Sequence, residues 1–524
     1  MRKLTLFICA ITLTALAGCH PPENIQNDIA DADTRPNIVI FYIDDLGFGD
    51  LGIYGASGVE TPNIDRLADN GLRFTDAHST AATCTPSRYS LLTGEHGFRI
   101  NAAILKGDAP ALIKPGKPTL PGMLQEAGYT TGVVGKWHLG LGDGNIDWNG
   151  KIAPGPLEVG FDHAFLLPAT GDRVPTVYIN NHRVVGLDSS DPIEVNYKKK
   201  VGTRADGISN PGELRVKADR QHSHTIVNGV SRIGYMGGGQ SALWTDEDFP
   251  DIFTEKAIEF IRENKNEPFF LFHSFHDIHV PRLPHPRFQG NSSMGPRGDA
   301  IVQMDWMVGQ VIQELDRLGL SENTLVIFTS DNGPVLFDGY FDGAFDKLGD
   351  HQPAGPYRGA KTSLFEAGTR VPTILHWPAG VTAGESDALL SQVDLYASLA
   401  DLVSQDLADS EAIDSLNMLD AFLGRSQTGR DYLLEEGITG VAIRQGRWKY
   451  IPASKRENGR AVIPVKMIET GWSQQPQLYD LETDIGERDN LAEKMPAKAA
   501  ELQAALDTYV SNGFRGRPAN HKVK

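Results

Sequence analysis

Residues 38–45 read IVIFYIDD, and this stretch indicates the fold class. An apolar run of this length is typical of a strand buried on both faces, because a strand with one wet face alternates polar and apolar residues. Further short strands are expected at residues 130–134, 268–275 and 324–329, and residues 299–318 repeat apolar side chains at helical spacing. Buried strands that alternate with amphipathic helices predict an α/β fold with a mixed, mainly parallel sheet between helices.

Composition narrows the class of protein. The chain has 524 residues, with 67 Asp+Glu against 49 Lys+Arg and a formal net charge of -18. This acidic balance argues against a nucleic-acid partner, which requires a basic surface. A content of 40% hydrophobic and 22% charged residues excludes collagen-like, disordered and polytopic membrane proteins. The three cysteines, Cys9, Cys19 and Cys84, are too few for a disulfide framework, and no CxxC pair is present.

The N-terminus predicts export. Residues 1–19 read MRKLTLFICAITLTALAGC, a basic start, a short apolar stretch and small residues before a cysteine, which resembles a bacterial lipobox. We therefore expect residues 1–18 to be a lipoprotein signal peptide and Cys19 to carry a lipid anchor to the membrane. Residues 19–35 are acidic and polar and are expected to form a flexible tether. The predicted location is the bacterial outer membrane, facing the periplasm or the cell surface; the alternative is an ordinary secretory signal with a chance cysteine.

The rest of the chain divides into two predicted parts. Residues 36–425 are expected to form the catalytic domain, in which the irregular stretch 144–239 is expected to shape a pocket rim. Residues 426–524 are expected to form a small C-terminal α+β domain with an antiparallel sheet. Within it, strands are expected at 441–452 and 477–481, and a closing helix is expected at 494–510.

Polar residues follow the predicted strands where each strand ends. A lone cluster of this kind is usually a turn or a helix cap, but here four strands carry one. Because ligands bind outside the carboxyl ends of strands in open α/β sheets, the four clusters are expected to converge on one site. The clusters are Asp44-Asp45, Lys136-Trp137-His138, the segment from His276 to Pro281, and Asp331-Asn332.

The oxygen-bearing residues of these clusters indicate a hard cation. Asp44, Asp45, Asp331 and Asn332 offer carboxylate and amide oxygens with no cysteine beside them, which favours Ca²⁺ or Mg²⁺ over zinc or copper. The alternative is that the two pairs cap different elements and never meet.

Residues 84–94 read CTPSRYSLLTG. The pattern C-x-P-S-R-x-x-L-L-T-G resembles the signature of the formylglycine-dependent (type I) sulfatases of the alkaline phosphatase superfamily. The resemblance runs from about Asn37 to the C-terminus and implies an alkaline-phosphatase-like large domain. It continues through Gly135-Lys136-Trp137-His138-Leu139-Gly140, His279-x-Pro281, Asp331-Asn332-Gly333, Lys361, Glu366-x-Gly368-x-Arg370-x-Pro372 and Leu478-Tyr479-Asp480-Leu481.

The resemblance implies a modified nucleophile. Cys84 matches the cysteine that a formylglycine-generating maturation enzyme oxidises to formylglycine (3-oxoalanine). The hydrated aldehyde attacks sulfur with one hydroxyl and uses the second to expel sulfate. By the same resemblance, Asp44, Asp45, Asp331 and Asn332 are expected to hold Ca²⁺ in preference to Mg²⁺, with the modified Cys84 as a further ligand.

The remaining site residues also take their roles from the resemblance. Arg88 is expected to hydrogen-bond the nucleophile and the metal carboxylates, and Lys136 and Lys361 to clamp sulfate oxygens. His138 is expected near the formylglycine. His279 is the expected general acid towards the leaving alkoxide, with His276 as a rival for that role or a substrate contact.

The function expected from the resemblance is hydrolysis of sulfuric esters on sugar residues. Export favours an external sulfated polysaccharide or its oligosaccharides as the substrate, and Asp172 and Arg173 are candidate sugar contacts or a structural ion pair. The positive charge that an anionic substrate needs is expected as a local cluster inside the acidic body. Two alternatives are a phosphonate or phosphodiester hydrolase of the same superfamily and a non-catalytic glycan-binding lipoprotein.

Overall fold

The computed structural model describes Met1 and residues 35–515. The predicted signal peptide, Cys19 and all of the predicted tether except Arg35 therefore lie outside the described residues. Within the described part of the chain, no helix is both long enough and apolar enough to cross a membrane.

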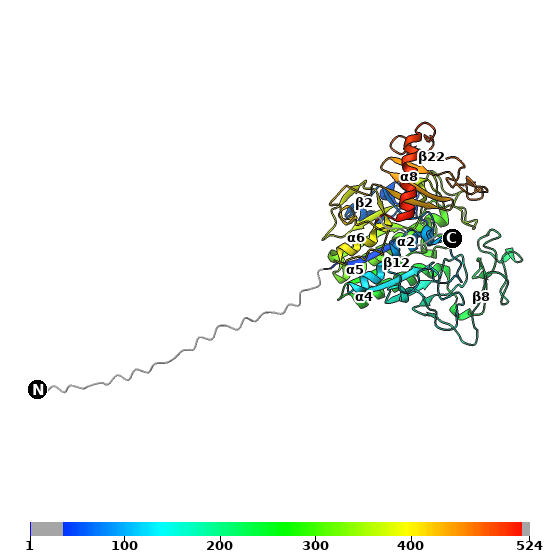
Figure 1. Cartoon of the computed structure of the whole chain (residues 1–524). Helices are drawn as coiled ribbons and strands as arrows, with labels where there is room; N and C mark the ends of the chain where they lie inside the picture. The colour runs from blue at the N-terminus through cyan, green and yellow to red at the C-terminus, as the bar shows by residue number, and fades with distance from the viewer. Residues whose placement is uncertain (2–34, 516–524) are drawn as a thin grey trace. The chain divides into compact units, whose positions relative to one another are not determined.

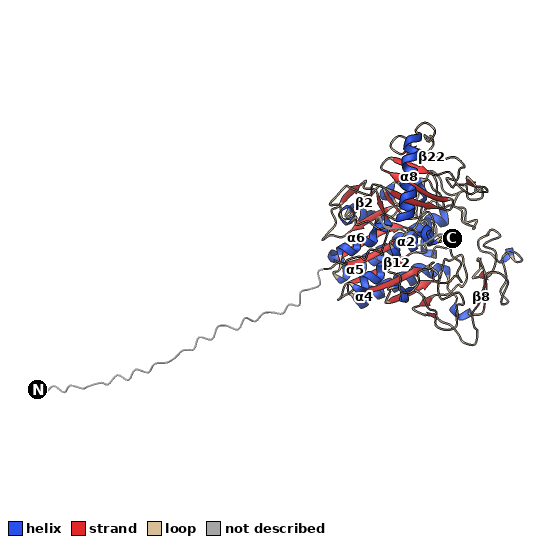
Figure 2. Cartoon of the chain, viewed as in Figure 1, coloured by secondary structure: helices blue, strands red, loops and turns tan. Residues whose placement is uncertain are grey.

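A ten-stranded mixed sheet forms the centre of the large domain, as Figures 1 and 2 show. Its five middle strands, β13, β1, β12, β4 and β5, are all parallel. The sheet runs in the order β15 (Gly384–Ser386), β2 (Leu72–Phe74), β14 (Thr373–His376), β13 (Thr324–Ser330), β1 (Asn37–Ile43), β12 (Phe269–Ser274), β4 (Thr130–Lys136), β5 (His163–Leu167), β6 (Ile179–Asn180) and β7 (Arg183–Val184).

Strand β1 shows why a continuous apolar run was required. Its even-numbered residues, Ile38, Ile40 and Tyr42, pack into one core, and its odd-numbered residues, Val39, Phe41 and Ile43, pack into the other. Helices cover both faces, so every side chain of the strand is buried. One layer contains α1 (Pro62–Asp69), α4 (Phe249–Asn264) and α5 (Gly295–Leu318), and the other contains α2 (Cys84–Thr93), α3 (Leu120–Glu126), α6 (Leu395–Leu402) and α7 (Leu419–Phe422).

The predicted mainly parallel α/β sheet is confirmed, and the four predicted strands are β1, β4, β12 and β13. The stretch 144–239 is only partly the irregular rim that was expected, because β5, β6 and β7 extend the central sheet from within it. The remaining short strands outside the C-terminal region are β3 (Ala77–His78), β8 (Glu194–Asn196), β9 (Ile226–Val227), β10 (Val230–Ser231), β11 (Tyr235–Gly237) and β16 (Leu390–Ser391).

A separate antiparallel sheet forms the C-terminal region, as predicted. Helix α8 (Pro496–Asn512) packs on it through Leu502 and Leu506, and Figure 1 shows this helix in red beside β22. The sheet contains β17 (Leu433–Gly437), β18 (Gly440–Gln445), β19 (Trp448–Ile451) and β22 (Gln477–Asp480), with a small hairpin of β20 (Val462–Ile463) and β21 (Ile468–Glu469) inserted before β22.

One strand prediction was wrong in this region. The stretch 441–452 was expected to be a single strand, but it is the hairpin of β18 and β19. The turn lies at Gly446, whose φ of +52° is in the left-handed region that glycine adopts without strain. The sequence did carry a signal for this turn, because residues 444–447 (RQGR) interrupt the alternation of apolar and polar residues and contain a glycine.

A buried ionic network joins the C-terminal sheet to the large domain. Lys449 of β19 donates to Glu366 at 3.0 Å and to Glu435 at 2.8 Å. Glu366, which belongs to the loop after Lys361, also accepts from Arg370 at 3.0 Å and from Arg444 at 3.1 Å. The charged residues of the E-x-G-x-R-x-P motif, Glu366 and Arg370, therefore help to connect the two domains.

We predict that Lys449→Met destabilises the protein by about 3–5 kcal/mol, because it removes the ammonium that the buried carboxylates of Glu366 and Glu435 share. Lys494→Met is the matched control, since Lys494 pairs with Asp489 at the surface, where both side chains are more than 60% exposed. The control is expected to change stability by less than about 1 kcal/mol. Urea unfolding of both variants measures the difference, and equal midpoints would contradict the prediction.

Candidate active site

The predicted clusters meet at the carboxyl ends of the parallel strands. Asp44 and Asp45 follow β1, Asp331 and Asn332 follow β13, and Lys136 is the last residue of β4. Adjacent strands hold these ends in register, and the amide of Asp331 donates to the carbonyl of Ile43 at 2.9 Å. The site therefore lies where ligands bind in open α/β sheets.

Four potential metal ligands converge there. The carboxylate oxygens of Asp44, Asp45 and Asp331 and the sulfur of Cys84 all lie within 4.8 Å of one another, and all four residues are buried. Asn332 donates through its Nδ2 to Asp45 at 2.8 Å, while its buried Oδ1 has no hydrogen-bond partner in the structure. Burial and the nearby Asp331 charge raise the pKa of Asp44 to about 8, a repulsion that a bound cation would remove.

Hard oxygen donors therefore converge on one position. The unpartnered Asn332 oxygen and the clustered carboxylates fit a divalent cation. The backbone of Asp45 has a φ of +64°, a left-handed conformation that is uncommon for a residue other than glycine. Strain of this kind persists where the surrounding structure enforces a functional geometry.

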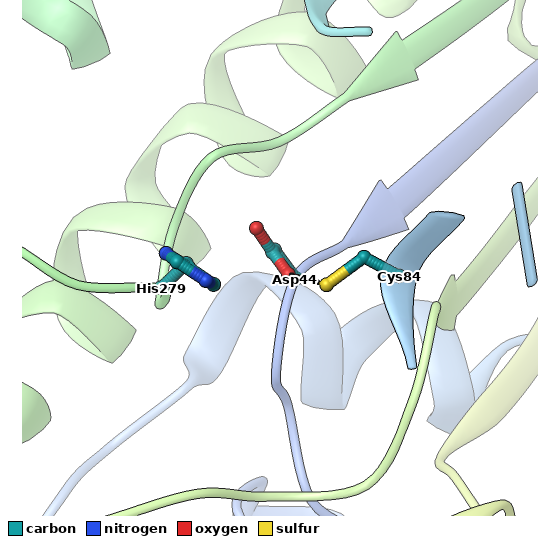
Figure 3. Close-up of side chains that lie close together, drawn as sticks. All are labelled: Asp44, Cys84 and His279. Carbon is teal, nitrogen blue, oxygen red and sulfur yellow. Dashed lines mark hydrogen bonds between the residues drawn. The ribbon is translucent and has the colours of Figure 1, made fainter. Parts of the chain in front are cut away.

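Cys84 is the first residue of α2, and its side chain faces the carboxylates. Its sulfur lies 3.6 Å from Asp44 Oδ1, and Figure 3 shows Asp44 between Cys84 and His279. Burial raises the pKa of the Cys84 thiol to about 12, although Lys136 and Lys361 oppose the shift. An unmodified thiol at this position would be almost entirely protonated at neutral pH, and a protonated thiol is a poor nucleophile.

Arg88 and Lys136 connect the nucleophile position to the carboxylates. Arg88 lies one helical turn after Cys84 and donates to Asp331 Oδ2 through Nε at 3.0 Å and Nη2 at 2.8 Å. Lys136 forms an ion pair with Asp44. Both cations are buried, and each one lowers the pKa of the carboxylate it contacts and so opposes the effect of burial.

His138 contacts the residue after Cys84, because Thr85 donates through its hydroxyl to the His138 carbonyl at 3.1 Å, and the His138 ring offers an acceptor nitrogen. Its Nε2 lies 3.0 Å from the carbonyl of Leu105, so this nitrogen carries the proton and donates. Its Nδ1 is buried with no partner in the structure. Burial, with Lys136 and Arg173 nearby, holds the pKa of His138 well below its usual range, so the ring is neutral.

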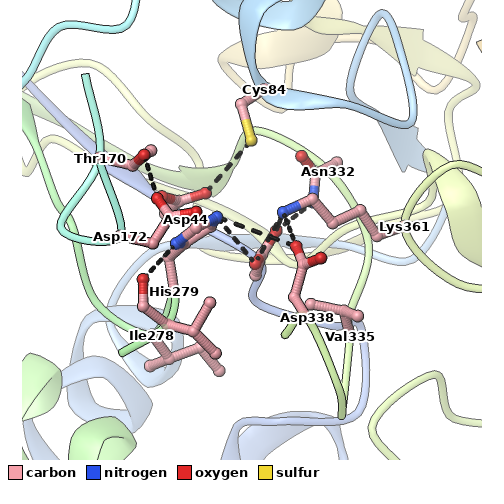
Figure 4. Close-up of polar contacts among 12 residues, drawn as sticks. Asp44, Cys84, Thr170, Asp172, Ile278, His279, Asn332, Val335, Asp338 and Lys361 are labelled. Atoms are coloured by element: carbon pink, nitrogen blue, oxygen red, sulfur yellow. Dashed lines mark hydrogen bonds and ion pairs between the residues drawn. The ribbon is translucent and has the colours of Figure 1, made fainter. Parts of the chain in front are cut away.

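Lys361 and His279 face the carboxylates from the other side, as Figure 4 shows. Lys361 Nζ lies 2.8 Å from Asp45 Oδ1 and 3.0 Å from Asp338 Oδ2. His279 Nδ1 lies 2.7 Å from the carbonyl of Val280 and therefore donates to it, which leaves Nε2 directed at the site. That nitrogen is 3.9 Å from Asp45 Oδ2 and 4.0 Å from Asp338 Oδ2.

His276 is placed less favourably for proton transfer. Its Nε2 is buried without a hydrogen-bond partner, and a side chain at Gly171 would lie 2.6 Å from that nitrogen. Burial and the Lys136 charge lower the pKa of His276 to about 3, and burial with the Lys361 and Lys136 charges also lowers the pKa of His279, so the enclosed Nε2 is what distinguishes His276. Its ring centre lies 5.7 Å from that of His279, so the two histidines are neighbours but occupy different environments.

Asp172 and Arg173 form the ion pair that was the alternative to a sugar contact. Arg173 Nη1 lies 2.7 Å from Asp172 Oδ1, and His222 Nε2 lies 3.3 Å from Asp172 Oδ2. Although burial opposes it, hydrogen bonds to Asp172 and Asp219 raise the pKa of His222 to about 9. The pair borders the site, because Asp172 and His279 are close enough to influence each other's pKa.

Sequence reasoning missed Asp338 and His222. Asp338 follows the D-N-G motif by a few residues in a Phe-Asp-Gly turn, which reads as an ordinary loop. His222 lies in the irregular stretch, where no periodicity marks it. Only the folded structure shows that Asp338 contacts Lys361 and that His222 contacts Asp172.

The close approach of two glycine-containing motifs shapes the Lys361 side of the site. Gly333 donates to the carbonyl of Gly368 at 2.9 Å, and a Cβ on Gly333 would lie 1.7 Å from the carbonyl oxygen of Ala367. Only glycine fits there, so the D-N-G turn and the E-x-G-x-R loop are fixed against each other. The whole arrangement can bind an anion between Lys136, Lys361 and a cation, with a nucleophile on one side and His279 on the other.

Comparison with known proteins agrees with this arrangement. The model of the family described as Sulfatase matches residues 36–405. An N-acetylgalactosamine-6-O-sulfatase from Bacteroides thetaiotaomicron is 48% identical over 95% of this chain and 97% of its own length. An N-acetylgalactosamine-6-sulfatase from Rattus norvegicus is 32% identical over 80% of this chain and 72% of its own length.

The solved structures agree as well. A structure from work on the metabolism of multiple glycosaminoglycans by Bacteroides thetaiotaomicron aligns with a TM-score of 0.88 and 49% identity, over 90% of this chain and 99% of that chain. The fold that carries the site is thus shared with that structure along nearly the whole chain. The protein belongs to the sulfatase family and is a sulfuric ester hydrolase.

Proposed function

We propose that this sulfatase removes a 6-O-sulfate group from N-acetylgalactosamine residues of glycosaminoglycan-derived saccharides. The observation that carries the proposal is the 48% identity to an N-acetylgalactosamine-6-O-sulfatase along 95% of the chain. That match spans the segment with Asp172, Arg173 and His222, which borders the catalytic residues and offers charged groups for sugar hydroxyls. An alternative consistent with the same fold is phosphonate or phosphodiester hydrolysis.

We propose that the nucleophile is formylglycine made from Cys84 by a maturation enzyme. The raised pKa of the thiol makes an unmodified Cys84 unsuited to attack sulfur. When present, formylglycine supplies a hydrated aldehyde, whose two hydroxyls serve for attack and for release of sulfate. His138 supports this role, because its unprotonated Nδ1 can accept a proton near the start of α2.

The chain's own residues then divide the remaining work. Lys136 and Lys361 bind sulfate oxygens and stabilise charge that shifts in the transition state. Arg88 holds Asp331 and orients the nucleophile from one helical turn away. Once protonated at Nε2, His279 donates that proton to the leaving sugar oxygen, because its Nε2 faces the site, whereas the Nε2 of His276 is enclosed against Gly171.

We propose Ca²⁺ as the cation, held by Asp44, Asp45, Asp331 and Asn332. A bound Ca²⁺ would polarise a sulfate oxygen and lower the repulsion among the carboxylates. Ca²⁺ is favoured over Mg²⁺ because several protein oxygens converge here, and Mg²⁺ usually retains much of its water shell.

We also propose that Cys19 carries the lipid anchor and that the enzyme acts at the bacterial outer membrane. The sequence around Cys19 supports this proposal. An anchored enzyme would meet external saccharides before or during uptake.

A panel of defined esters tests the substrate. We expect kcat/KM for N-acetylgalactosamine-6-sulfate saccharides to exceed that for the 4-sulfate isomers by roughly 100-fold or more, since a polar pocket rejects misplaced groups strongly. N-acetylglucosamine-6-sulfate, 4-nitrophenyl sulfate and bis(4-nitrophenyl) phosphate complete the panel. Preference for another sulfated sugar would reject the substrate, and preference for the phosphodiester would favour the alternative hydrolase.

The same panel separates the two histidines. His279→Gln is expected to lose roughly 10²–10⁴-fold on the saccharide ester but far less on 4-nitrophenyl sulfate, whose leaving group needs little protonation. His276→Gln is the matched control and should affect both esters alike. If His276→Gln alone shows the leaving-group dependence, the assignment is reversed.

Peptide mass analysis tests both modified cysteines. In enzyme purified from bacterial membranes, we expect Cys84 to appear with its CH₂SH group replaced by CHO and Cys19 to appear at the N-terminus with attached lipid. Enzyme made without a maturation enzyme should retain the Cys84 thiol and lose at least about 10³-fold in kcat. Full activity with an intact thiol would contradict the nucleophile, and a retained segment 1–18 would contradict the anchor.

Chelation tests the cation. Removal of bound metal should abolish turnover and lower thermal stability, and Ca²⁺ at about 100 times its Kd should restore about 2.7 kcal/mol. We expect Asp44→Asn to lose this Ca²⁺-dependent stabilisation, whereas Asp489→Asn, a change at an exposed carboxylate, should keep it. A stronger response to Mg²⁺ than to Ca²⁺ would overturn the choice of ion.

A further inference from the structure

Asp338 lies between two lysines and the proposed general acid. Its Oδ2 is 3.0 Å from Lys361 Nζ and 4.0 Å from His279 Nε2, as Figure 4 shows in part. Its other oxygen, Oδ1, forms an ion pair with Lys466. The two oxygens of one carboxylate therefore have separate partners, and the Lys466 contact sets which oxygen faces the site.

Lys466 comes from the C-terminal region, far from the other site residues in sequence. It lies in the turn between β20 and β21, and we call residues 461–470 the C-terminal hairpin. Only 26% of the Lys466 side chain is exposed, so its ammonium is directed inward to Asp338 and away from bulk solvent. The hairpin thus carries a cation to the rim of a site formed by the large domain.

The same hairpin is fastened to the loop that carries Lys361. Ser363 donates through its hydroxyl to the carbonyl of Glu469 at 2.6 Å, and the amide of Leu364 donates to the carbonyl of Thr470 at 3.0 Å. Arg358 Nε donates to the carboxylate of Glu469 at 3.0 Å. The hairpin and the Lys361 loop therefore form one connected unit.

Lys361 has a carboxylate partner that is not one of the proposed cation ligands. Its two carboxylate contacts are Asp45 and Asp338, and Asp45 belongs to the proposed cation ligands. Asp338 can therefore hold the Lys361 ammonium without drawing a carboxylate away from the cation. A bare carboxylate beside a sulfate would repel it, and Lys466 supplies the charge that offsets this repulsion.

We propose that Asp338 and Lys466 are positioning residues, through which the C-terminal hairpin orients the ammonium of Lys361 towards the sulfate group. Lys466 fixes one carboxylate oxygen and neutralises Asp338, and the other oxygen holds Lys361. The inference rests on the role proposed for Lys361 as a sulfate clamp. It does not depend on which sugar carries the sulfate.

Steady-state kinetics of Lys466→Met test the proposal, with 4-nitrophenyl sulfate and the fastest saccharide of the panel as substrates. We expect kcat to fall roughly 10- to 100-fold on both, with KM changed less than about threefold, because charge stabilisation in the transition state is lost. Lys466→Arg should recover most of the activity, since it keeps the cation. Lys455→Met is the matched control, because Lys455 is an exposed lysine shortly before the hairpin.

A double variant tests whether Lys466 acts through Asp338. If it does, Lys466→Met combined with Asp338→Asn should be no slower than Asp338→Asn alone, because the two residues share one pathway. Thermal melting of each variant identifies any loss that comes from unfolding. The proposal would be overturned if the two substitutions lowered kcat independently, so that the double variant were slower than either single variant by the product of their effects. It would also be overturned if Lys466→Met were as active as Lys455→Met.

The two substrates also distinguish positioning from sugar recognition. A loss confined to the saccharide would make Lys466 a sugar contact and overturn the proposal. Because 4-nitrophenyl sulfate needs only sulfate ester hydrolysis, the test remains valid even if the panel rejects N-acetylgalactosamine-6-sulfate as the substrate.

Discussion

Mutual repulsion among three buried carboxylates is the constraint on which the rest of the site depends. Asp44, Asp45 and Asp331 are placed together by the parallel register of β1 and β13, and they cannot move apart without breaking the sheet. Several charges of one sign in a low-dielectric interior are stable only when cations are close. Arg88 and Lys136 supply part of that charge, and the unpartnered Asn332 oxygen marks where a metal ion would supply the rest.

The C-terminal region supports this site from outside the central sheet. Glu366 lies in the loop that follows Lys361, and its ion pairs with Arg444 and Lys449 tie that loop to β18 and β19. The C-terminal hairpin holds the same loop through Ser363 and Leu364. Any charged residue of this buried network that lost its partner would strongly destabilise the folded state. Other positions of the loop would break these ion pairs, so the network restricts the loop to one geometry.

The central sheet was predictable because each buried parallel strand, such as residues 38–43, is a continuous apolar run with polar residues at its end. The meeting of Asp44, Asp45, Asp331 and Asn332 was predictable for the same reason, since strand ends in one sheet meet at one edge. Contacts between loops have no such regularity. Asp338, Lys466 and His222 belong to turns and irregular segments, and only the folded chain brings them to Lys361 and Asp172. The β18–β19 turn was missed although Gly446 and its polar neighbours interrupt the alternation there, because a single glycine within a strand pattern also fits a bulge.

The charge balance of the site explains how an acidic protein can bind a sulfate. The carboxylates of Asp44, Asp45, Asp331 and Asp338 are matched in number by the cations Arg88, Lys136, Lys361 and Lys466. The protein groups alone are therefore close to neutral, and a divalent cation would make the site positive. Burial, Lys361 and Lys136 hold the pKa of His279 well below its usual range. An incoming sulfate ester opposes the two lysine charges, so substrate binding itself would raise that pKa and favour the protonated form that the leaving oxygen needs.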